Sequence, residues 1–206
     1  MPIVSTMLSM TRRLLQLYAG LILYGVSLAL QIRAGLGLDP WDVFHQGISD
    51  KTGLSFGTIV IIIGALVLLA WIPLRQKPGI GTVSNVFVLG IVVDITLAVL
   101  GDVHGFGYQL ALLTTGVVLN AVAGAAYIGA GLGPGPRDGL MTGFVRTTGR
   151  GVGVIRTSIE VSVLAIGFLL GGTVGLGTVV YALSIGPLLQ FFLPAFTIQP
   201  PLPATA

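Results

Sequence analysis

Charged side chains within long apolar stretches are the residues of this chain best placed to do chemistry. Asp94 lies in one such stretch, and Arg156 and Glu160 lie four residues apart in another. A charge at the centre of a bilayer costs about 2.5 to 3.5 kcal/mol even on insertion scales, so it is retained for a reason. The spacing places Arg156 and Glu160 on one helix face, which predicts a structural intramembrane pair or, as the functional alternative, a gated charge pair or proton carrier. Asp94 has no such neighbour, and its depth in the membrane decides whether it simply reaches water near the outer end of its helix.

Two further carboxylates, Asp42 and Asp138, occupy equivalent places in short polar segments. Each is the third residue of a predicted short helix that begins at Pro40 or Pro136. A carboxylate there interacts favourably with the helix dipole and with free N–H groups, so helix capping accounts for both residues. The alternative is a pair of ion or proton sites related by an internal repeat. Both interpretations remain open.

Uncharged polar residues complete the candidate site. Asn85 and Asn120 lie in apolar stretches, where amides most often form hydrogen bonds between helices. The candidate substrate-binding or ion-binding residues are therefore Asp42, Asp138, Glu160, Arg156, Asp94, Asn85, Asn120 and Arg137.

The segments that carry these residues are repeated. Sliding the chain by 96 residues without a gap aligns positions 14–90 with 110–186, and 27 of the 77 aligned positions are identical. Chance would match roughly a tenth of positions in a chain of this composition, so we interpret the match as an internal repeat. The matches include Pro, Asp and Thr, which are less common here than Gly and Leu.

Each predicted short helix follows a glycine-rich segment. Gly35 and Gly37 precede Pro40, and Gly131 and Gly133 precede Pro136. Non-helical backbone at membrane depth is tolerated only where protein buries it or where it lines a wet cavity, and paired broken segments are typical of transporter sites. Ordinary interfacial turns explain the glycines equally well. The predicted helices end at Gly53 and Gly149, about 18 Å long, which is too short to cross a bilayer.

The composition indicates an integral membrane protein. Hydrophobic residues make up 54% of the chain and charged residues 8%, against about 25% in soluble domains. A membrane-spanning helix needs about 20 apolar residues. Six segments qualify: 14–33, 54–74, 80–101, 108–130, 152–171 and 174–193.

The fold we predict is all-α, with six transmembrane helices arranged as two repeats of three. Each repeat has a short broken or interfacial helix between its first and second span. The chain divides into an N-terminal segment 1–13, a first repeat 14–101, a second repeat 108–193 and an irregular tail 194–206. Three spans per half make the second half enter from the opposite side, so the repeats are predicted to be inverted.

Loop charges favour both termini on the cytoplasmic side of the membrane, because cytoplasmic loops are enriched in Lys and Arg. Under this topology only Arg33 and Lys51 of the loop cations lie outside. Those inside are Arg12, Arg13, Arg75, Lys77, Arg137, Arg146 and Arg150.

Several function classes lack support in the sequence. There are no cysteines, and His45 and His104 have no metal-ligand spacing, so we expect no metal. The glycine runs match neither a P-loop nor a dinucleotide motif, and we expect no catalytic residues and no cofactor. The net charge of +3 is too small and scattered to predict nucleic-acid binding.

The chain resembles the YczE/YyaS/YitT group of bacterial membrane proteins. The resemblance rests on AGLGLDPWDVFHQG at residues 34–47, the two flanking spans and the glycine-led start Gly79-Ile80-Gly81-Thr82-Val83-Ser84-Asn85. It implies a bacterial inner-membrane protein and no particular activity. The second copy has Gly135 and Arg137 where the first has Asp39 and Trp41, so a site shared by the halves is asymmetric.

The function we predict is a small secondary permease that moves a small polar or ionic solute between the inverted repeats. The alternative is a non-transporting membrane scaffold or regulatory partner. A membrane enzyme acting on lipid ranks last. The expected partners are the lipid bilayer and a small solute, and a second copy or a partner membrane protein is left open.

Overall fold

The structure is a computed structural model that describes residues 2–198, and this part of the chain is all helical. Its eight helices are α1 (Pro2–Ala34), α2 (Pro40–Thr52), α3 (Phe56–Trp71), α4 (Ile80–Val99), α5 (Phe106–Gly129), α6 (Pro136–Thr148), α7 (Val152–Leu169) and α8 (Leu176–Phe196). The two short helices, α2 and α6, therefore fall where the sequence predicted them.

Five of the described helices are long and apolar enough to cross a membrane: α1 from Met10, α4, α5, α7 and α8. A sixth crossing exists if α2 and α3, which are bent by 116° relative to each other, count as one span. Large apolar side chains on the outer faces, such as Leu169 and Phe191, are more than three-quarters exposed. An all-α membrane protein with five to six spans is the result.

The predicted span 54–74 is shorter than expected. Helix α3 has 16 residues, because Ser55 caps its first turn and a turn over residues 72–75 ends it. At 1.5 Å per residue it reaches about 24 Å, less than the ~30 Å hydrocarbon layer. Helix α3 is the shortest of the strongly apolar helices and falls short of a full crossing by itself.

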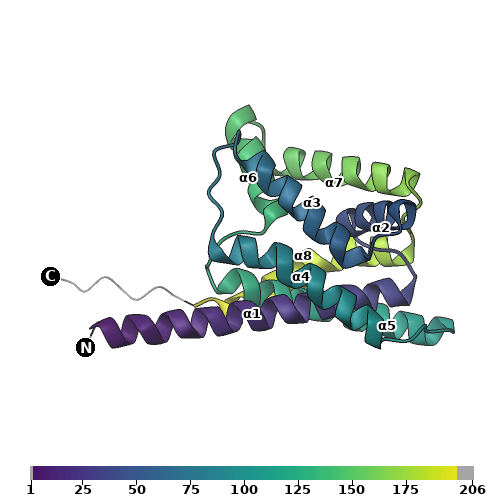
Figure 1. Ribbon diagram of the computed structural model, residues 1–206, viewed down its shortest axis with the longest axis horizontal. Helices are drawn as coiled ribbons and strands as arrows, with labels where there is room; N and C mark the ends of the chain where they lie inside the picture. Colours follow the sequence, from purple (N-terminus) through teal and green to yellow (C-terminus); the bar gives the residue numbers. More distant parts are fainter. Residues whose placement is uncertain (1, 199–206) are drawn as a thin grey trace.

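The helices form two groups (Figure 1). Helices α1 and α5 pack along each other, with α4 against α1 and α8 against α5. The second group pairs α2 with α7 and α3 with α6. Leu17, Leu21 and Leu28 of α1 are almost fully buried at the centre of the first group. The long helices thus form a platform on which the two short helices and their neighbours lie.

Helix α3 also packs along α4 and so joins the two groups. The equivalent pair in the second half, α7 and α8, makes no comparable contact within the described residues.

The C-terminal prediction was wrong at its first residues. Helix α8 continues through Pro187 and Pro194 to Phe196, three residues into the segment expected to be irregular. Membrane helices tolerate proline because neighbouring groups satisfy the freed carbonyls. Residues 199–206 lie outside the described residues. At the other end, α1 begins at Pro2, so the predicted N-terminal segment is helical.

Candidate functional site

The start of α2 is fixed by a side-chain cap. One carboxylate oxygen of Asp39 accepts hydrogen bonds from the backbone N–H of Trp41 (2.8 Å) and of Asp42 (3.1 Å). Pro40 occupies the first turn, where its missing N–H leaves no bond unmade. Gly53 ends the helix with φ 73°, a conformation that favours glycine.

Helix α6 repeats this plan without the acidic cap. Gly135 stands in the capping position and forms no side-chain bond, while Pro136 again begins the helix and Gly149 ends it with φ 69°. Asp138 lies in the first turn, where a carboxylate favours the positive end of the helix dipole. The capping interpretation thus fits Asp138, whereas in α2 the cap is Asp39.

The glycine-rich approaches are non-helical and cross the start of a helix from the opposite half. Gly37 and Gly133 have φ of 110° and 127°, which other residues rarely adopt. The carbonyl of Leu36 accepts from the N–H of Gly177 (2.7 Å), and the carbonyl of Leu132 accepts from the N–H of Gly81 (2.8 Å). Main-chain bonds therefore tie each half to the other.

The approach glycines also sit against backbone. A side chain at Gly37 would collide with Gly175, and one at Gly133 with Gly79 and Thr82. Gly35 and Gly131 have φ of 64°. All four glycines of the predicted motif thus occupy left-handed or otherwise glycine-favouring turns.

A buried cluster surrounds Arg137, which we call the Arg137 cluster: Asp39, Asp42, His45, Trp41 and Arg137. The guanidinium of Arg137 lies 3.1 Å from an Asp42 oxygen and 3.5 Å from an Asp39 oxygen, and both carboxylates are almost fully buried. Asp42 also contacts the Nδ1 of His45 at 3.1 Å. The guanidinium lies 5.1 Å from the centre of the Trp41 ring, within cation–π range.

The cluster joins the two halves of the chain, since four members come from α2 and its cap and Arg137 comes from α6. Removing two buried carboxylates from water is costly, and the single arginine offsets the cost for both. Asp42 is thus an ion-pair partner of the opposite half, beyond any capping role.

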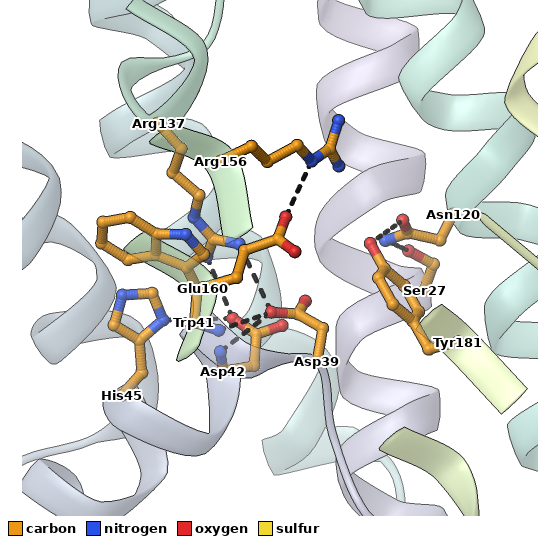
Figure 2. Close-up of polar contacts among 10 residues, drawn as sticks. All are labelled: Ser27, Asp39, Trp41, Asp42, His45, Asn120, Arg137, Arg156, Glu160 and Tyr181. Carbon is orange, nitrogen blue, oxygen red and sulfur yellow. Dashed lines mark hydrogen bonds and ion pairs between the residues drawn. The ribbon is translucent and has the colours of Figure 1, made fainter. Parts of the chain in front are cut away.

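A second polar group lies across a gap from the cluster (Figure 2). The amide nitrogen of Asn120 donates to the Ser27 hydroxyl (2.9 Å), and the Tyr181 hydroxyl donates to the Asn120 oxygen (3.1 Å). These bonds join α1, α5 and α8. The expectation that Asn120 bonds between helices is confirmed.

A cavity of about 230 Å³ lies between the Arg137 cluster and the Asn120 group, and residues of both line it. Its lining includes six of the eight candidate residues: Asn85, Asn120, Arg137, Asp138, Arg156 and Glu160. Asp42 lies behind the lining, in the Arg137 cluster, and Asp94 lies elsewhere. Among residues 2–198 no group of three or more His, Cys, Asp or Glu side chains could hold a metal ion.

Arg156 and Glu160 pair as the spacing predicted, with Nε and Oε1 2.8 Å apart. Neither side chain is buried by the rest of the protein, since the two are 59% and 38% exposed. The cause is the position of α7, whose face bearing this pair borders the cavity instead of packing against another helix.

Asp94 has partners that the sequence did not reveal. Its two carboxylate oxygens accept from the Ser55 hydroxyl (2.5 Å) and from the Gly57 N–H (2.7 Å), at the start of α3. The Asp94 carboxylate thus caps the start of the neighbouring helix α3.

Several lining residues were missed from the sequence: Tyr24, Asp39, Trp41, His45, Tyr127 and Tyr181. The repeat held a usable signal. Tyr24 aligns with Asn120, and Asn85 aligns with Tyr181, so at two lining positions the repeat exchanges a tyrosine for an asparagine.

These features define an integral membrane protein with an all-helical fold and a charged internal cavity. A family of unknown function, DUF6198, matches residues 11–194, and the chain belongs to this family. Its relatives confirm the resemblance seen in the sequence.

A protein of Haemophilus influenzae is 38% identical over 183 residues, covering 89% of this chain and 84% of the relative. The membrane protein YczE of Bacillus subtilis is 36% identical over 180 residues, covering 86% and 83%. YyaS of the same organism is 27% identical over 179 residues, covering 85% and 89%. No solved structure matches the chain.

Proposed function

We propose that the protein is a small secondary permease whose two halves are inverted repeats and whose solute passes through the cavity between them. The solute site would lie where the two broken segments approach each other, as in transporters built from inverted repeats. The proposal needs two things: a two-fold relation between the halves and a means of opening the cavity to alternate sides.

Reciprocal contacts support the two-fold relation. Residue 36 aligns with 132 and residue 81 with 177, so the Leu36–Gly177 and Leu132–Gly81 bonds are the same contact made in both directions. A two-fold axis between the halves produces this exchange of partners. With three spans per half, we propose that the axis lies in the membrane plane.

One asymmetric contact carries the proposal of alternating access. Gly57 of α3 and Gly90 of α4 touch so closely that a Cβ on either would collide with the carbonyl oxygen of the other. Their repeat equivalents are Gly153 of α7 and Gly186 of α8, where an added Cβ would meet nothing within 4 Å. The same glycine pair is therefore packed in one half and apart in the other.

Small residues at helix interfaces allow close backbone approach. We infer that Gly153 and Gly186 serve a second state in which α7 packs on α8 while α3 leaves α4. With both termini cytoplasmic, the α3–α4 contact lies toward the outside and the Gly153–Gly186 gap toward the cytoplasm. The state described here would then be open inward.

The test uses the absence of native cysteine. The double variant Gly153→Cys with Gly186→Cys places two thiols on α7 and α8, and a disulfide needs Cα atoms within about 7 Å. We expect oxidation in native membranes to cross-link the pair within one chain, seen as a shift in gel mobility.

The control is Gly107→Cys with Gly153→Cys, since a Cβ at Gly107 also meets open space and its helix, α5, makes no substantial contact with α7 among the described residues. Cross-linking of both pairs would indicate non-specific collision. No cross-link in either pair would refute alternating access and leave the non-transporting scaffold as the better interpretation.

A further inference from the structure

We infer that the cavity binds a small organic cation that carries N–H donors, such as a protonated amine. The inference rests on the proposed permease, because this cation would be the transported solute. It deepens that proposal by naming a chemical class, and it follows from four properties of the cavity wall.

The first property is an unused buried acceptor. Asp39 is 3% exposed and lines the cavity, yet its Oδ2 has no hydrogen-bond partner. The other oxygen, Oδ1, already accepts from two backbone N–H groups and faces Arg137. Figure 2 shows Asp39 on the side of the Arg137 cluster that faces Tyr181 and Asn120. A buried carboxylate oxygen left without a donor is costly, and an N–H of a bound cation would satisfy it.

The second property is a hydroxyl in the same condition. Tyr127 is 4% exposed and lines the cavity, and its hydroxyl has no hydrogen-bond partner. It lies beside the start of α6, near Gly135 and the Asp138 carboxylate. This oxygen can accept a second N–H, so the two unused acceptors come from opposite halves of the chain.

The third property is charge. Three carboxylates line the cavity, those of Asp39, Asp138 and Glu160, against the two guanidinium groups of Arg137 and Arg156. Asp42 stands directly behind the wall and adds to the negative excess. The wall therefore attracts a cation more strongly than an anion.

The fourth property is the aromatic lining of the cavity together with the cavity's volume. Tyr24, Tyr181 and Trp41 face a cavity of about 230 Å³, roughly the volume of seven or eight waters. Aromatic faces attract cations, and the Trp41 ring already holds the Arg137 guanidinium at 5.1 Å. Arg137 shows within the molecule that this wall accommodates an N–H-bearing cation.

The test titrates the purified, full-length protein with methylammonium, trimethylammonium and tetramethylammonium chloride, and with sodium acetate and methylphosphonate, by calorimetry. Tetramethylammonium has the charge of the others but no N–H. We expect trimethylammonium to bind at least about tenfold more tightly than tetramethylammonium, the loss typical of one hydrogen bond to a charged group. Neither acetate nor methylphosphonate should bind.

The variant Asp39→Asn keeps a good helix cap and should lose the preference for trimethylammonium. Asp102→Asn, at an exposed carboxylate paired with Arg33, is the matched control and should keep it. If Asp39→Asn fails to fold, the comparison of cations on the unaltered protein still decides.

Equal affinity for both cations, binding of the anions, or no binding of any cation would overturn the inference. The disulfide experiment on α7 and α8 contains no ligand, so its outcome stands apart. A cross-link without cation binding would support the permease proposal and refute the cation as its solute. Cation binding without a cross-link would support the cation site and refute alternating access.

Discussion

The α3–α4 contact and the α7–α8 pair are built from equivalent residues, yet only the first is packed. Along α3, Gly64 lies against Val86 of α4, and a Cβ there would be tightly confined. The equivalent residue of α7 is Glu160, whose carboxylate is bonded to Arg156 at the cavity edge. Packing α7 on α8 would have to redirect this ion pair or remove it from water. The second half thus carries a charge at the position where the first carries a glycine.

The α3–α4 contact also includes hydrogen bonds to a carboxylate that the α7–α8 pair lacks. Asp94 accepts from Ser55 and Gly57 across the α3–α4 contact. The equivalents of Asp94 and Ser55 are Gln190 and Gly151, and an amide bonds more weakly than a carboxylate. We infer that the two closures differ in free energy and that the α3–α4 contact is the more stable.

The largest effect is expected from the Arg137 cluster, which joins the two halves of the chain. Arg137→Met leaves Asp39 and Asp42 buried without their cation, which typically destabilises a protein by about 3 to 5 kcal/mol. Denaturant unfolding in detergent micelles measures the change, with Arg150→Met at an exposed loop position as control. Equal stability of the two variants would show that the cluster does not hold the halves together.

A smaller effect on stability should distinguish the Gly57–Gly90 pair from the Gly153–Gly186 pair. Gly57→Leu forces a side chain into the Gly90 backbone and should destabilise the observed packing by about 1 to 3 kcal/mol. Gly153→Leu enters open space and should change stability by less than about 0.5 kcal/mol. The unfolding midpoints of the two variants give the comparison. Equal losses would contradict the difference between the halves.

The smallest effect is expected at the Arg156–Glu160 pair. Both side chains are substantially exposed, and such pairs contribute about 0 to 1 kcal/mol. Arg156→Gln and Glu160→Gln should therefore unfold close to the unaltered protein, as should the double variant. A loss of several kcal/mol in a single variant that the double variant restores would mean that the pair is buried, as its apolar sequence context had suggested.

Local signals in the sequence predicted much of the fold. Proline at the start and glycine after the end located both short helices, because these residues act on the backbone of their own segment. The end of α3 was missed, because apolar composition continues past Trp71 while the helix does not. The reach of α8 was missed because a proline in a membrane helix need not end it.

The site was harder to predict, since its contacts join distant parts of the chain. Arg137 and Asp42 are 95 positions apart, and no spacing rule relates an arginine on one short helix to a carboxylate on the other. Asp39 caps α2 with one carboxylate oxygen, and the other oxygen remains for the cavity. Helical spacing paired Arg156 with Glu160 correctly, yet burial depends on which helix lies opposite.

The bonds from Gly177 to Leu36 and from Gly81 to Leu132 join main-chain atoms only. Replacing either leucine changes a side chain and leaves its carbonyl in place, so random mutation at these two positions has little power to undo the crossing. Substitution of the glycines is more damaging, because a side chain there would meet the backbone of the approaching segment. Sequence drift in this fold should therefore be tolerated on one side of each crossing and restricted on the other.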